Sequence, residues 1–202
     1  EDGTYELDGE RHQLSLTEPE HRNAIHGLVR GEPWKVAEQE HSRVLMTYAL
    51  EPQPGYPFSL EVELEYSLTG DGLRVQTKAT NVGGKAAPYG SGAHPYLRAG
   101  SATVDSATLR IPARTVLQSN DRGLPVGSGP VEGSEFDFRS PRPIGATVLD
   151  HAFTDLERGG DGLARVELAD RVSLWVDESY PYLMIFTGDP LPDVNRRSLA
   201  VE

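Results

Sequence analysis

Residues 59–68 read SLEVELEYSL, and here apolar side chains alternate with polar ones, mostly glutamate, at every second position. Side chains of a β-strand point alternately to its two faces, so this pattern predicts a strand with one dry and one wet face. The tripeptide Gly70-Asp71-Gly72 follows, and it predicts a hairpin turn because glycine tolerates positive φ. Residues 73–79 (LRVQTKA) then resume the alternation, which predicts a second strand paired antiparallel to the first.

The same period of two recurs along the whole chain, and no window of a dozen residues shows an apolar stripe at helical spacing. Many short strands separated by turn signals predict an all-β, antiparallel sandwich in a single domain spanning residues 1–202. Three stretches rich in Gly, Pro and Ser, 82–92, 120–133 and 139–144, are expected to be irregular loops. The further predicted strands are Thr4–Leu7 and 12–16 around the turn Asp8-Gly9, Arg43–Leu50, 108–111, 114–118, Ala164–Leu168, Val172–Val176 and 182–187.

Composition excludes several classes of function. The 202 residues carry a net charge of −12, which repels phosphate backbones, so we expect no nucleic-acid partner. There are no cysteines, so disulfides, thiol nucleophiles and zinc–thiolate sites are excluded, and a reducing cytoplasm is the expected location. The longest uninterrupted apolar run, 182–186, is too short to span a bilayer, and we expect no membrane partner.

His94 lies in the most unusual local sequence among the six histidines, YGSGAHPY at 89–96. Gly90 and Gly92 permit a close approach of the backbone to a ligand, and Pro95 restricts the conformation of His94. Tyr96 offers a flat ring on which a ligand can stack. Histidine serves as an acid or base near neutral pH, so His94 is a candidate catalytic residue. The alternative interpretation is a loop histidine that its neighbours hold stiff.

Three further candidates come from similar reasoning. His26 lies in a His-Gly corner, IHGLVR at 25–30, with Trp34 shortly after it, and the alternative is an ordinary turn histidine. Asp150 begins a strand-like run next to His151, although aspartate is common in turns and caps. Glu202 closes an apolar alternation, where an inward-pointing carboxylate would have a raised pKa, while a terminal charge is more usually solvated. The sequence contains no His-x-x-x-His spacing and no acidic calcium loop, so no metal is implied.

Five short pieces, in this order, resemble the aldose 1-epimerase (galactose mutarotase) family. The block His94-Pro95-Tyr96 is the most specific of them, and together the pieces run from near the first residue to the last. The resemblance implies an antiparallel β-supersandwich, truncated at both ends because the family's outer strands and an arginine-containing motif are missing. The pieces are NAIHG at 23–27, Asn81 with GAHPY at 92–96, LDHAF at 149–153, FTGD at 186–189 and LAVE at 199–202.

Carried over residue by residue, the resemblance makes His94 the general acid and Glu202 the general base of sugar-ring opening. His26 and Asp150 match residues that hold the sugar hydroxyls, and we expect Tyr96 and Trp34 to contact the sugar as well. The implied substrate is a free hexose of the glucose or galactose type. The implied reaction needs no cofactor, because interconverting two anomers involves neither redox chemistry nor group transfer.

Two alternatives stay open at the level of sequence. An epimerase of hexose 6-phosphates would need several arginines around the phosphate, and Arg30, Arg196 and Arg197 are the candidates. A carbohydrate-binding domain without catalytic activity is the other alternative, because a fold does not determine a function. The preferred sugar and the oligomeric state do not follow from the sequence.

Overall fold

The computed structural model describes residues 2–202, and within that range it contains sixteen β-strands, one 3-10 helix at Pro19–His21 and no α-helix. Every strand pairing in the four sheets is antiparallel, which confirms the predicted all-β class. The chain divides into two compact units, residues 1–91 and residues 92–202, which are described separately below. The organisation of the chain as a single domain stays a prediction.

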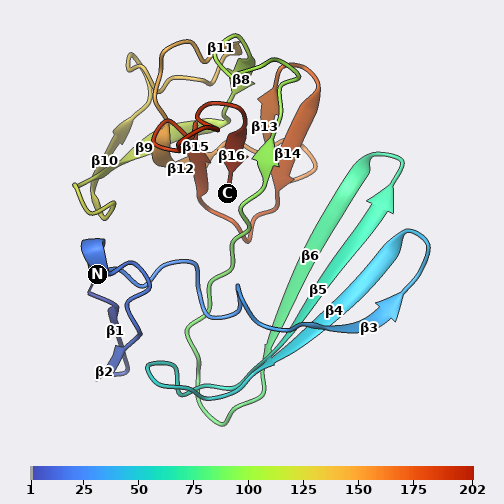
Figure 1. Cartoon of the computed structure of the whole chain (residues 1–202), viewed down its shortest axis with the longest axis vertical. Helices are drawn as coiled ribbons and strands as arrows, with labels where there is room; N and C mark the ends of the chain where they lie inside the picture. The colour runs from blue at the N-terminus through green and yellow to red at the C-terminus, as the bar shows by residue number, and fades with distance from the viewer. Residues whose placement is uncertain (1) are drawn as a thin grey trace. The chain divides into compact units, whose positions relative to one another are not determined.

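Unit 1 contains a two-stranded hairpin and a four-stranded meander (Figure 1). The hairpin turns at Asp8-Gly9 as predicted, with both residues at positive φ (50° and 80°), as a two-residue turn of this kind requires. The turn at 70–71 is likewise a two-residue connection, because Thr69 pairs with Gly72. The strands are β1 (Thr4–Leu7) and β2 (Glu10–Gln13) in the hairpin, then β3 (Lys35–Gln39), β4 (Arg43–Leu50), β5 (Leu60–Thr69) and β6 (Gly72–Asn81) in the meander.

The predicted dry face of β5 is buried at only one end. Leu60 and Val62 are 4% and 6% exposed and belong to the core of unit 1, whereas Leu68 is 61% exposed. The wet face carries cross-strand ion pairs, including Arg43 with Glu65 at 2.7 Å. The alternation therefore predicted the strand and its two faces, but how far the dry face is covered depends on neighbours remote in sequence.

Unit 2 is built from two sheets with a core between them (Figure 1). The six-stranded sheet has the order β10-β9-β12-β15-β16-β7, and the four-stranded sheet has the order β11-β8-β13-β14. The core residues come from both sheets, for example Phe153 and Ile185 from the first and Leu109 and Val166 from the second, and all four are fully or almost fully buried. The strands are β7 (Tyr96–Leu97), β8 (Thr108–Arg110), β9 (Ala113–Ser119), β10 (Pro125–Pro130), β11 (Arg142–Pro143), β12 (Asp150–Leu156), β13 (Ala164–Leu168), β14 (Val172–Val176), β15 (Leu183–Phe186) and β16 (Leu199–Val201).

Two of the three stretches expected to be loops contain strands, so those two expectations were wrong. Strand β10 lies inside 120–133 and pairs with β9, and β11 lies inside 139–144 and pairs with β8. Both are edge strands, where proline is tolerated because one side of the strand needs no partner. The sequences of the two strands, PVGSGP and RP, lack the apolar alternation on which the prediction relied. The stretch 82–92 is free of strand, as expected.

Among the described residues, no helix has the length and apolar character needed to cross a membrane.

Candidate active site

The register of the six-stranded sheet brings the candidate residues of unit 2 onto one face. Asp150 pairs with Phe186, Phe186 pairs with Ala200, and Ala200 pairs with Tyr96, so these four residues form one row across four strands. Paired residues point to the same side of a sheet, and the neighbouring row, which includes Ile185, faces the buried core. Asp150 and Tyr96 therefore belong to the face opposite the core.

Glu202 reaches the same face two residues after Ala200. Its backbone exchanges two hydrogen bonds of 2.8 Å with Met184, which continues the β15–β16 ladder to the last residue. The amide of Val201 also donates to the carbonyl of Pro95 at 3.2 Å, and this bond places the segment before β7 beside the end of β16. These contacts fix the backbone of Glu202, so its side chain starts from a defined place on this face.

His94 and Glu202 are in direct contact. The Nε2 atom of His94 lies 3.0 Å from Oε1 of Glu202, and their side chains are 36% and 24% exposed. The imidazole and the carboxylate are thus within hydrogen-bond distance of each other.

Burial and neighbouring charges shift the pKa values of the two carboxyl groups. Burial raises the pKa of Glu202, the contact with His94 opposes that rise, and the nearby Asp150 carboxylate adds to it. Burial also raises the pKa of Asp150, with an opposing effect from His151. The half-buried carboxyl group of Glu202 and that of the exposed residue Asp150 thus share one face of the sheet with an imidazole, which is an arrangement suited to proton transfer.

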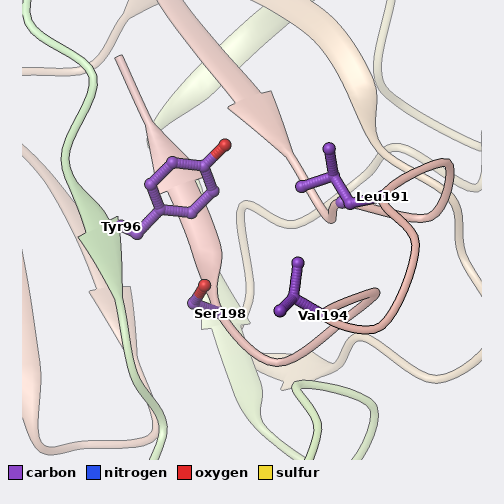
Figure 2. A pocket seen from close by; sticks show the side chains of 5 residues that line it. Tyr96, Leu191, Val194 and Ser198 are labelled. Carbon is purple, nitrogen blue, oxygen red and sulfur yellow. The ribbon is translucent and has the colours of Figure 1, made fainter.

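Tyr96 links this pair to a small pocket. Its ring stacks on His94 with centroids 4.9 Å apart and planes 26° apart. The ring also forms one wall of an open pocket of about 320 Å³, and Figure 2 shows Leu191 and Val194 on the far side of it. The pocket is lined by Tyr96, Gly188, Leu191, Val194 and Ser198, so no cationic side chain lines it.

Four of these five pocket residues were not predicted from the sequence. Gly188, Leu191, Val194 and Ser198 lie in the segment between β15 and β16, which has no periodicity that would assign its side chains to a face. A usable signal was the piece FTGD, since Gly188 is at φ +76° and starts the turn away from β15.

His26 lies in unit 1, in a left-handed conformation with φ +66°, which is unusual for a residue other than glycine. The Arg30 Nη1 atom lies 3.1 Å from its Nδ1 atom. Arginine only donates hydrogen bonds, so Nδ1 accepts here and, in the neutral ring, the proton is on Nε2. His26 is an exposed residue of unit 1.

Trp34, the second candidate in unit 1, packs within the core of that unit. Its indole N–H donates to the carbonyl of Val29 at 3.3 Å, and its ring lies 5.6 Å from that of Tyr48. These contacts are those of a structural residue, and the role of Trp34 in sugar binding stays a prediction. No cluster of three or more potential metal ligands occurs within residues 2–202.

Comparison with known proteins gives a consistent result. The family profile described as aldose 1-epimerase matches residues 1–202. The chain is 33% identical over 202 residues to the uncharacterized protein YihR of Escherichia coli, covering 99% of this chain and 64% of that protein. It is 30% identical over 156 residues to human galactose mutarotase, covering 73% of this chain and 44% of that protein. The chain thus spans less than two thirds of the length of either relative.

Solved structures share the fold. An aldose epimerase homologue from Caenorhabditis elegans superimposes with a TM-score of 0.79 at 18% identity, covering 99% of this chain and 68% of that one. A galactose mutarotase-like protein from Clostridium acetobutylicum gives a TM-score of 0.77 at 16% identity, covering 99% and 64%. Both confirm the mutarotase-like architecture that the sequence predicted.

Proposed function

We propose, since this chain belongs to the aldose 1-epimerase family, that the protein interconverts the α and β anomers of a free hexose. The observation that carries the proposal is the 3.0 Å contact between His94 and Glu202 on the face of the sheet that also holds Asp150 and Tyr96. An imidazole and a carboxylate within hydrogen-bond reach of each other can act on two oxygens of one small ligand.

The reaction opens the sugar ring and closes it on the other face of C1. Ionised Glu202 takes the proton from the C1 hydroxyl, and protonated His94 delivers a proton to the ring oxygen as the bond between C1 and that oxygen breaks. Rotation about the bond between C1 and C2, followed by the reverse proton transfers, yields the other anomer. Glu202 is then ionised and His94 protonated again, so no proton or electron is gained or lost. Each positioned acid or base typically contributes about 10²–10⁴-fold.

The neighbouring residues take the supporting roles. Asp150 accepts hydrogen bonds from sugar hydroxyls, and the exposed ring of Tyr96 stacks on the apolar face of the sugar. His26 and Trp34, which the family resemblance and the local sequence suggest as further sugar contacts, keep that role as a prediction. A location in the cytoplasm also stays a prediction.

Hexose 6-phosphates are less suitable as substrates. Arg196, one of the arginines considered for a phosphate, makes ion pairs with Asp105 and Asp189, and its side chain is only 13% exposed. The pocket beside Tyr96 has Leu191 and Val194 in its lining and no cation. An unphosphorylated hexose fits these surroundings better.

Polarimetry of freshly dissolved α-glucose or α-galactose tests the proposal. We expect the protein to accelerate the change in optical rotation, and to act more slowly on glucose 6-phosphate. Binding of the hexose without any acceleration would replace the proposal with a carbohydrate-binding role. Faster turnover of the phosphorylated sugar would point to the other epimerase class.

A further inference from the structure

We infer that Arg196 is a positioning residue of the candidate active site, holding both the start of β12, where Asp150 lies, and the segment 188–198, which lines the pocket and leads to Glu202. This inference rests on the proposed function for its kinetic consequences. Arg196 is the centre of a hydrogen-bond and ion-pair network, in a region where the sequence showed only two adjacent arginines, Arg196 and Arg197.

Arg196 binds four residues in three segments of the chain, two of which are distant from it in sequence. Its guanidinium lies 2.5 Å from the carboxylate of Asp105 and 2.8 Å from that of Asp189. It also donates to the backbone carbonyls of Gly145 at 2.7 Å and Thr147 at 3.3 Å. Such forked, charge-assisted hydrogen bonding needs arginine, because lysine presents a single ammonium instead of a planar set of donors.

The first connection runs from Arg196 to Asp150. The carboxylate of Asp189, which Arg196 binds, also accepts a hydrogen bond from the hydroxyl of Thr187. Thr187 is fully buried, and its hydroxyl oxygen accepts the amide proton of Leu149 at 3.0 Å. The Thr187 amide donates to the Leu149 carbonyl at 2.9 Å. Leu149 precedes Asp150, so this relay fixes the backbone at the point where Asp150 enters the site.

The second connection runs through the chain itself. Arg196 adopts a left-handed conformation, φ +55°, which its side-chain contacts hold in place, and its carbonyl accepts the amide of Val104 at 2.7 Å. Strand β16 begins three residues later at Leu199 and leads directly to Glu202. The preceding residues Leu191 and Val194 line the pocket beside Tyr96. One largely buried arginine side chain therefore supports two sides of the site.

The electrostatic consequence can be measured at Glu202. The charges that act on the Glu202 carboxylate are those of His94 and Asp150. His151 in turn interacts electrostatically with Asp150 and with Glu135. If the start of β12 loosens, the like charge of Asp150 moves away from Glu202. The pKa of Glu202 then falls, because one of the two influences that raise it is weakened.

The test compares Arg196→Lys with Arg165→Lys, a matched change in an exposed pair with Asp161 in the same unit. In the full protein we expect R196K to lower kcat/KM by at least about tenfold and to move the acid limb of the pH–rate profile to lower pH. R165K should leave both unchanged. An R196K profile that coincides with that of the wild type in a folded protein would overturn the inference.

A second pair of variants covers the case in which R196K does not fold. Thr187→Val removes the relay hydroxyl and keeps Arg196, whereas Thr187→Ser restores the hydroxyl and should restore the profile. A carbon-13 NMR titration of the Glu202 carboxyl measures the same shift without any turnover. If the wild type is inactive but the Glu202 titration of the variants differs from that of the wild type, the proposed function is rejected and the positioning role is kept. If the titration of Glu202 is unchanged in both T187V and R196K, the positioning role is rejected.

Discussion

The Nε2 atom of His94 lies 3.0 Å from Oε1 of Glu202, although the two residues come from opposite ends of unit 2. The contact exists because β7, which follows His94, and β16, which precedes Glu202, are hydrogen-bonded neighbours in one sheet. All of the following predictions except the one for His26 depend on this pair or on the sheet that brings it together.

Removing either member of the pair should abolish most of the activity. We expect His94→Asn and Glu202→Gln each to lower the rate of mutarotation by about 10²–10⁴-fold, because each removes one proton-transfer group. Polarimetry measures the rate, and circular dichroism checks the fold. His41→Asn, a change at an exposed histidine in a turn, is the control and should have no effect. An unchanged rate in H94N would remove His94 from the mechanism.

The acid limb of the pH–rate profile should lie above the ordinary pKa of an exposed glutamate, which is about 4.3. Glu202 acts as a base only when ionised, and burial together with Asp150 raises its pKa, so activity is lost as the pH falls through that raised value. Asp150→Asn removes the like charge and should move this limb to lower pH. A limb that stays in place or moves upward in D150N would contradict the electrostatic argument.

Tyr96 should contribute to sugar binding through its ring and not through its hydroxyl. We expect Tyr96→Ala to raise KM by roughly two- to tenfold, since an aromatic stacking contact is worth about 0.5–1.5 kcal/mol. Tyr96→Phe keeps the ring and should behave like the wild type. Steady-state kinetics with galactose separates the two variants, and equal KM values for Y96A and Y96F would refute the stacking role.

His26 should matter as a hydrogen-bond donor. Its Nδ1 atom accepts from Arg30, so in the neutral ring Nε2 carries the proton, and we expect that group to donate to a sugar hydroxyl when the hexose binds. His26→Leu should weaken hexose binding more than His26→Gln, because glutamine retains an N–H donor. Isothermal calorimetry with the hexose measures the difference. If both variants bind as tightly as the wild type, His26 is only the turn residue of the alternative interpretation.

The core beneath the site should be sensitive to truncation. Phe153 is fully buried at the centre of β12, between β9 and β15. Phe153→Ala should lower the free energy of unfolding by about 3–5 kcal/mol, because it removes apolar burial and leaves a cavity. Tyr182→Ala, a change at a side chain that is 56% exposed, should cost less than about 0.5 kcal/mol. Urea denaturation monitored by circular dichroism compares the two.

Local patterns were sufficient for the strands that carry apolar alternation and for the turns that need positive φ. The alternation in β5 and the turn Asp8-Gly9 were both predicted and both occur. Strands β10 and β11 were missed because glycine, proline and serine at a sheet edge carry no period. The segment from Gly188 to Ser198 gave no sign that it lines a pocket, because the chain there follows contacts with Arg196 and not a repeating geometry.

The amino-acid sequence by itself determined the all-β class and marked His94 as chemically unusual. Strand faces, turns and the restricted backbone conformation of a residue before proline all depend on near neighbours in the sequence. For Glu202, Asp150 and His26 the local sequence left the functional and the ordinary interpretation open, and the family resemblance favoured the functional one, since isolated carboxylates and turn histidines look alike in a sequence. Tertiary structure alone decided that His94 touches Glu202, that Asp150 shares their face and that Arg196 joins Asp105, Asp189 and the backbone before β12. Those relations depend on which strands pair and in which register, and pairing between distant strands is decided by burial of the whole core.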